Sequence, residues 1–247
     1  MTPPKQDLVA NLLLRGLAPS DFDRLAPDLE RVPLMRRQQL VQPHRPTEHM
    51  WFVDSGLGSL VAATPEGHSS EVGVIGRDGL VGIPLLLGTD RTPQQVVIQE
   101  DGTGWRIGAG ALEAALGASR TLHLSLLRYV QALNVQAGHT ALSNAVHTAE
   151  ERLARWLLMA HDRSDGDELA LTHEFLALML AVRRPTVTTT LHVLEGMGLI
   201  RNQRSLIVIR DREGLEALAA DAYGIPEAEY ERLVGSLRRR AESLGTA

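Results

Sequence analysis

Two adjacent arginines stand in the segment "AVRRPTVTTTLHVLE", which covers residues 181–195 and also contains a proline and four threonines. A guanidinium group can donate two parallel hydrogen bonds to O6 and N7 of guanine, which discriminates against other bases by about 1–3 kcal/mol. A threonine hydroxyl can bind phosphate, and its methyl group can contact thymine. The pattern therefore indicates recognition of double-stranded DNA. The candidate contacts in this segment are Arg183, Arg184, Thr186, Thr188 and Thr189.

The charge around this segment supports the same function. Residues 181–210 contain five arginines and one glutamate, whereas the complete chain of 247 residues has a formal net charge of −5. A local basic surface on an acidic chain is typical of a DNA-binding module, because phosphates attract such a surface whatever the base sequence. Arg201 and Arg204 therefore join the candidate contacts. The alternative is an ordinary surface helix whose arginines are solvated.

The residues around the arginine pair predict two helices and a hairpin. Thr172 fits the N-cap of the first helix, and Pro185 suits the start of the second because the first N–H groups of a helix lack partners. The second helix is expected to end near Gly196. A tight turn at "RNQR" (201–204) and a strand at "RSLIVIRD" (204–211) should follow. Helix, turn, helix and β-hairpin in this order form a winged helix-turn-helix.

The earlier part of the chain predicts a sheet and then a long helix. Residues 30–110 alternate short apolar runs with glycine and proline, which predicts an antiparallel β jelly roll and an α+β fold class. Residues 111–161 contain two glycines and no proline and predict helix. A narrow apolar row within them predicts a dimer seam, with a helix lying on its own sheet as the alternative. The seam residues are Leu126, Val130, Leu133 and Ala137.

The composition excludes several kinds of chemistry. Without cysteine the chain has no disulfide, thiolate zinc site, iron–sulfur ligands or cysteine nucleophile. Nucleophile-elbow, Walker and zinc-protease motifs are absent, so no cofactor, metal or enzymatic activity is expected. No apolar run approaches the length of a membrane span, and the first residues do not resemble a signal peptide. A cytoplasmic location is expected.

Three aspartates in "HDRSDGDE" (161–168) could suggest calcium, but the twelve-residue loop that ends in glutamate is missing. A solvated interdomain loop is expected at Asp162, Asp165 and Asp167. The alternative function for the whole chain is a small-molecule-binding protein whose winged helix docks other proteins.

The segment "LTHEFLALMLAVRRPTVTTTLHVLEGMGLI" (171–200) resembles the winged helix-turn-helix of the Crp/Fnr family of bacterial transcription regulators. The order of β-rich domain, long helix and DNA-binding domain agrees with that family over about residues 10–220. The resemblance implies that Arg184 recognises guanine. Thr189 stands where some members carry a second base-contacting arginine, and Pro185 where many carry a glutamate. The operator is therefore expected to differ from that of the cyclic-AMP receptor.

The segment "GRDGLVGIPLLLGTDRT" (76–92) resembles the phosphate-binding cassette of the same family. Leu80 stands where cyclic-AMP binders carry a glutamate for the ribose, and two apolar positions replace their Thr-Ser pair. Each unpaired polar group of a ligand costs about 1–3 kcal/mol, so control by cyclic AMP is not expected. Arg91 leaves another nucleotide or a small anion as an alternative. The implied effector pocket comprises Gly79, Leu80, Gly82, Arg91, Thr92, Ala137 and Gly138.

The resemblance also implies domains and partners. A sensor or scaffold β-domain is expected at 10–115, a dimerisation helix at 116–147, the winged helix-turn-helix at 148–220 and a loosely attached helical tail at 221–247. A hinge is expected near 145–150. A homodimer on a palindromic operator would place its recognition helices one DNA turn apart, about 34–36 Å. The expected partners are DNA, a second copy of the chain, RNA polymerase and an unidentified small-molecule effector, and no membrane.

Overall fold

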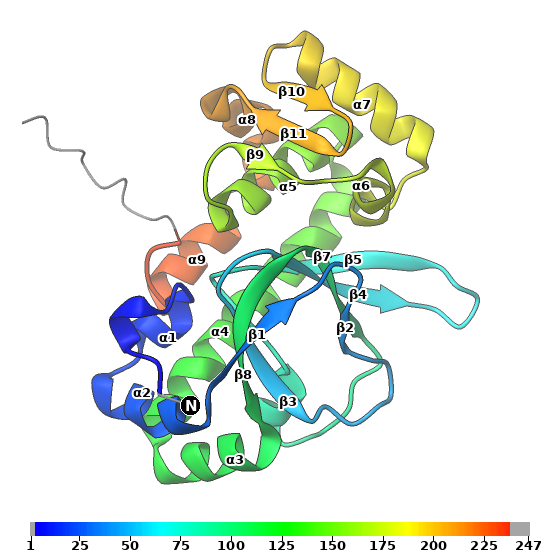
Figure 1. The fold of residues 1–247 in the computed structure, drawn as a ribbon. Helices are drawn as coiled ribbons and strands as arrows, with labels where there is room; N and C mark the ends of the chain where they lie inside the picture. Colours follow the sequence, from blue (N-terminus) through cyan, green and yellow to red (C-terminus); the bar gives the residue numbers. More distant parts are fainter. Residues whose placement is uncertain (1–2, 238–247) are drawn as a thin grey trace, which may run out of the picture.

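Strands β1–β8 form two antiparallel sheets in the computed structural model, which describes residues 3–237 (Figure 1). One sheet has the order β1-β8-β3-β6 and the other has the order β2-β7-β4-β5. These strands are called the β-domain. Their bounds are β1 (Glu30–Leu34), β2 (Gln39–Val41), β3 (His49–Val53), β4 (Leu57–Ala63), β5 (Ser69–Ile75), β6 (Leu80–Val81), β7 (Gln95–Glu100) and β8 (Gly102–Gly108).

Alternating side chains of both sheets meet in a core between them. Val53 and Val81 come from one sheet and Val96 and Ile98 from the other, and all four are buried. Gly82 precedes the short helix η3 (Ile83–Leu87) with a φ of 111°. A Cβ atom there would lie 2.9 Å from the carbonyl oxygen of His49, so this close turn requires glycine.

Short helices cover the end of the β-domain where the chain begins. The side chain of Asn11 caps one of them and donates hydrogen bonds of 2.8 Å to the carbonyl oxygens of Val53 and Gly79. This buried amide therefore joins the N-terminal segment to the strand ends. The helices are η1 (Gln6–Leu8), α1 (Leu12–Gly16), α2 (Pro19–Leu25), η2 (Ala26–Asp28) and, after the strands, α3 (Ala109–Ala118).

The long helix α4 (Arg120–Val146) runs along the β-domain. Its packing contradicts part of the predicted dimer seam. Leu126 and Leu133 are only 1% and 5% exposed, in a core that they share with the β-domain and the N-terminal helices. Val130 and Ala137 are half-buried. The seam prediction is wrong for the two leucines because strand β5 and the N-terminal helices cover this face of α4. The alternative, a helix on its own sheet, is correct for them.

The C-terminal half forms a winged helix-turn-helix, as predicted, and α5–α8 are called the winged-helix domain. Thr148 and Glu151 form a capping box at its first helix. The hairpin differs from the prediction, because Arg201–Gln203 belong to a strand and the turn lies at Arg204 and Ser205. The elements are α5 (Ala149–Arg163), β9 (Glu168–Leu169), α6 (His173–Leu180), α7 (Arg184–Gly196), β10 (Ile200–Gln203), β11 (Leu206–Ile209) and α8 (Arg212–Ala219).

The segment after α8 returns to the β-domain side of the molecule. Helix α9 (Ile225–Leu233), which follows η4 (Ala220–Ala222), packs against α4 (Figure 1). Tyr230 and Leu237 are 4% and 3% exposed and join the core of α4 and the N-terminal helices. The expectation of a loosely attached tail is therefore wrong up to residue 237. The remainder of the predicted tail, residues 238–247, lies outside the described residues.

Candidate nucleic-acid interface and ligand cavity

Helix α7 is an outer element of the winged-helix domain and lies on the side away from the β-domain (Figure 1). Val187, Leu191 and Leu194 are 0% exposed and hold one face of α7 on the core of this domain. Spacings of four and three residues place these side chains on a single helical face. The opposite face of α7 is open to solvent.

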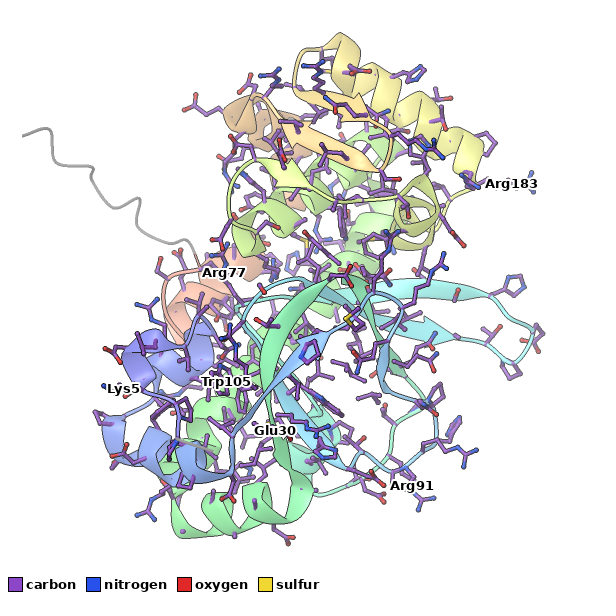
Figure 2. All side chains as sticks on the ribbon, viewed as in Figure 1. Lys5, Glu30, Arg77, Arg91, Trp105 and Arg183 are labelled. Atoms are coloured by element: carbon purple, nitrogen blue, oxygen red, sulfur yellow. The ribbon has the colours of Figure 1, made fainter. Side chains whose placement is uncertain are left out.

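The arginine pair lies at the exposed N-terminus of α7. Ala181 ends α6 in the left-handed conformation, with a φ of 50°, and Arg183 is the N-cap of α7. Arg184 is its first residue, followed by Pro185 in the first turn, as predicted. Both arginines are exposed, and within residues 3–237 no ion pair involves either one. Figure 2 shows Arg183 at the outer edge of the domain. Both guanidinium groups are therefore available to a ligand.

The threonines of α7 differ in exposure. Thr186 and Thr189 are exposed, Thr188 is half-buried, and the fourth, Thr190, is 1% exposed. The hydroxyls of Thr188 and Thr189 donate to the carbonyl oxygens four residues earlier, at 3.3 and 3.2 Å. A hydrogen bond to phosphate would require these hydroxyls to rotate away from the backbone, whereas the methyl groups need no such change.

The hairpin β10–β11 adds two exposed arginines beside α7. Arg201 lies on β10 and Arg204 in the turn, and both are exposed. The backbone N–H of Asn202 donates to Oε1 of Glu195 at 2.9 Å. The one acidic residue of segment 181–210 therefore ties the hairpin to α7 instead of neutralising an arginine of this surface.

One exposed residue of this surface is absent from the sequence prediction. His192 is exposed on α7, three and four residues after Thr189 and Thr188. That spacing places the three side chains on one helical face. Helical periodicity, counted onward from Thr188 in the sequence, is the signal that would have added His192 to the predicted DNA contacts.

Three buried charged residues join the winged-helix domain to the β-domain. Arg163, at the end of α5, donates from Nη2 and Nε to the two carboxylate oxygens of Asp78, at 2.7 and 3.0 Å. Arg77 donates from Nε to the carbonyl oxygen of Arg163 at 3.0 Å and from Nη1 to Asp165 at 2.6 Å. Figure 2 shows Arg77 at this junction. Asp165 is thus ion-paired, but its side chain is 67% exposed, so the expectation of a solvated position holds for it.

The other two aspartates are also paired, and the expectation of a solvated loop is wrong for Asp162, which is a buried residue of α5. Asp162 is 6% exposed and accepts hydrogen bonds from Arg212 and from the hydroxyl of Tyr223, at 2.7 and 2.6 Å. Asp167 contacts Nε2 of His161 at 2.9 Å. Sequence spacing did not reveal these partners, because they come from elements that only the tertiary fold brings together.

A buried carboxyl group lies at the same junction. Glu71 of β5 accepts hydrogen bonds from Nε1 of Trp156, at 3.0 Å, and from the hydroxyl of Ser59. Trp156 belongs to α5, so this contact also crosses between the two domains. Burial raises the pKa of Glu71 to about 8. The carboxyl group is therefore largely protonated at neutral pH.

A cavity of about 170 Å³ lies within the β-domain and includes some of the predicted effector residues. Leu80, Gly82, Arg91 and Thr92 line it. The guanidinium of Arg91 pairs with Asp90 at 3.2 Å, and 58% of the Arg91 side chain is exposed. Figure 2 shows Arg91 at the lower right of the β-domain, well below Arg183 in the winged-helix domain.

The other predicted effector residues lie outside this cavity. Gly79 packs against Tyr129 of α4, where any Cβ atom would collide with the phenol ring. Ala137 is half-buried and Gly138 is exposed, both on α4. Within residues 3–237 no group of three His, Asp or Glu side chains could hold a metal ion. No helix in that range is long and apolar enough to cross a membrane.

Two family models match separate parts of the chain. The model of the cyclic nucleotide-binding domain matches residues 31–119, and that of the Crp-like helix-turn-helix domain matches residues 151–218. Together they cover more than half of the sequence. A comparison with curated protein sequences found no match.

Several solved structures share the fold. FixK2 from Bradyrhizobium japonicum is 19% identical with a TM-score of 0.68, and the alignment covers 78% of this chain and 98% of FixK2. A regulator of the Crp/Fnr family from Eubacterium rectale is 17% identical with a TM-score of 0.65, over 84% and 97% of the two chains. The c-di-GMP responsive regulator CLP from Xanthomonas campestris is 17% identical with a TM-score of 0.60, over 78% and 99%.

Proposed function

Because the chain belongs to the Crp/Fnr family of transcription regulators, we propose that it binds a palindromic DNA operator as a homodimer, without control by cyclic AMP. In this proposal the N-terminus of α7 enters the major groove and Arg184 recognises guanine. Arg183, Arg201 and Arg204 contact the phosphates on either side.

The observation that carries the proposal is the exposed arginine pair at the start of α7. An unpaired guanidinium at a helix N-terminus is disfavoured by the positive end of the helix dipole, so a phosphate or base acceptor would relieve an unfavourable charge. The same helix is held rigidly by Val187, Leu191 and Leu194. A rigid support with free guanidinium groups suits base recognition, because the ordering cost on binding is small.

The proposed dimer uses a face of α4 that residues 3–237 leave uncovered. Leu124, Leu142 and Val146 are 43%, 52% and 65% exposed, which is unusual for large apolar side chains on one helix. Gly138 is exposed between them and would allow two helices to approach closely. A parallel pair of α4 helices would carry the two winged-helix domains on one side, as a two-fold-symmetric operator requires.

The proposal excludes cyclic AMP because two residues of the cavity, Leu80 and Arg91, are poor partners for the ribose and the phosphate of this ligand. Leu80 is 0% exposed and offers no hydrogen-bond acceptor to a ribose hydroxyl. Arg91 already pairs with Asp90, so a cyclic phosphate would compete with a carboxylate for it. The similar regulator CLP is responsive to c-di-GMP, and a nucleotide other than cyclic AMP is the alternative effector here. Contact with RNA polymerase stays a prediction.

The proposal is tested by selecting random duplex DNA with the purified protein at moderate salt, without added ligand. We expect a palindrome whose half-sites lie about one helical turn apart. The selection is repeated with Arg184→Ala and with Arg24→Ala, a matched control because Arg24 is exposed on α2 in the N-terminal segment. Recovery of the same sequence by Arg184→Ala, or of no palindrome by the wild type, would contradict the proposal.

A further inference from the structure

The cavity in the β-domain is lined mostly by carbon. Its walls come from strands of both sheets and from η3, and most of its lining residues are aliphatic. The aliphatic residues that define its walls are Leu60, Ile75, Leu80, Val81, Ile83 and Val96.

Charge is confined to one edge of this lining. Among the described residues that line the cavity, Arg91 is the one with an ionised side chain. Its guanidinium is mostly exposed and pairs with Asp90. An anion placed among the aliphatic walls would lose its hydration without gaining a partner, which is strongly unfavourable. An uncharged apolar molecule in the same place would only release water from apolar surface.

The size of the cavity limits the ligand. Its volume is about 170 Å³. An engineered apolar cavity of about 150 Å³ in another protein stays dry and binds benzene or xenon. A single aromatic ring or a short branched hydrocarbon is therefore the size that would fill this cavity.

We propose that the effector of this regulator is a compact, uncharged and largely apolar molecule about the size of one aromatic ring. It binds among Leu60, Leu80 and Val96, and its polar substituent, where it has one, faces Thr92 at the edge. This inference rests on the proposed function, because an effector has a role only if the chain regulates DNA.

One segment of the chain contributes both to the wall of the cavity and to the contact with the winged-helix domain. Ile75 and Leu80 line the cavity, and between them lie Arg77 and Asp78, which bind the end of α5. The hydroxyl of Tyr230 on α9 donates to the carbonyl oxygen of Asp78 at 2.7 Å. A ligand that displaces this segment would thus change the contacts of α5 and α9 at once. Differential affinity for the two arrangements would make it an effector.

Binding is tested with benzene and xenon as probes on the DNA-free protein. We expect saturating benzene to raise Tm by about 2–4 °C and xenon to give a shifted ¹²⁹Xe resonance, whereas cyclic AMP changes neither. Val96→Phe should fill the cavity and abolish both responses. Val97→Phe is the matched control, because Val97 is the next residue on β7, is half-buried and does not line the cavity. Val96→Ile fills less of the cavity than Val96→Phe and should weaken xenon binding. This variant provides the test if Val96→Phe does not fold.

The outcomes separate this inference from the proposed function. The inference is overturned if neither probe affects the wild type, if Val96→Ile binds xenon as the wild type does, or if Val97→Phe loses the response as completely. A protein that selects a palindrome but ignores both probes keeps the proposed function and loses this effector. A protein that binds the probes but selects no DNA keeps the apolar binding site and loses the proposed function.

Discussion

Arg163 and Asp78 form a bidentate ion pair of 2.7 and 3.0 Å between the winged-helix domain and the β-domain, with side chains 3% and 2% exposed. Water cannot replace either partner at this depth, so each charge depends on the other. Asp78 lies in the segment between Ile75 and Gly82, and the residues on either side of it, Ile75 and Leu80, line the cavity. The orientation of the two domains and the shape of the cavity are therefore linked through one pair of residues.

Breaking this pair on one side should destabilise the protein strongly. Asp78→Asn leaves the charge of Arg163 buried without its counter-ion, and we expect a loss of about 3–5 kcal/mol in the free energy of unfolding measured with urea. The double variant Asp78→Leu with Arg163→Met buries no charge and should lie closer to the wild type. A single variant that loses less than the double variant would contradict this explanation.

The pH dependence of stability should depend on Glu71. Its pKa is about 8 in the folded protein because of burial, against 4.5 in the unfolded chain. The folded state therefore holds one more proton between these values, and stability contributed by this group falls as pH rises from about 5 to 8. Glu71→Gln keeps the shape and cannot titrate, so its stability should fall less over this range, by at most about 1.4 kcal/mol per pH unit. Parallel curves for the two proteins would exclude the proposed titration.

The hydroxyl of Tyr230 should stabilise the attachment of α9. Tyr230→Phe removes one buried hydrogen bond to Asp78 and retains the ring, so we expect a loss of about 1 kcal/mol in the free energy of unfolding. Tyr230→Ala also removes the ring from the core and should cost about 3–5 kcal/mol. Urea unfolding measures both. If neither variant differs from the wild type, α9 is not anchored in solution as it is in the structure.

Arg184 and Arg204 should affect DNA binding in different ways. Arg204→Ala should weaken binding of all sequences alike and reduce the slope of log K against log salt by about one, since it removes one phosphate contact. Arg184→Ala should relax the preference at one base position by about 1–3 kcal/mol. Titrations of the selected operator and single-base variants at several salt concentrations measure both effects. If both variants lose the same base preference, the assignment of base recognition to Arg184 and of phosphate contact to Arg204 is wrong.

An ionised residue on the uncovered face of α4 should prevent dimerisation. Leu142→Arg places a charge where two α4 helices would meet, and we expect a monomer in sedimentation velocity with an unchanged far-UV circular dichroism spectrum. Leu8→Arg is the matched control, because Leu8 is 76% exposed on η1 and lies outside α4. If Leu142→Arg remains a dimer, the dimer contact lies elsewhere. If the wild type is a monomer, the proposed dimer is ruled out.

The sequence alone predicted the helices of the helix-turn-helix because their signals are local. Thr172 caps α6 and Pro185 lies in the first turn of α7, as predicted, and each signal acts within about one helical turn. The turn of the hairpin was misplaced by a few residues, because Arg201–Gln203 are polar and gain strand structure only by pairing with Leu206–Ile209. Local chemistry determined which elements form, and pairing determined where the strands end.

Tertiary structure decided what each element meets. The apolar row of Leu126 and Leu133 was visible in the sequence, but periodicity cannot tell whether a second copy or the same chain covers it. The same reason applies to Tyr230, whose segment returns to α4, and to Asp78 and Arg163, which are 85 residues apart in the chain. Helical periodicity acts over a few residues, whereas burial and ion pairing depend on distances that the complete fold sets.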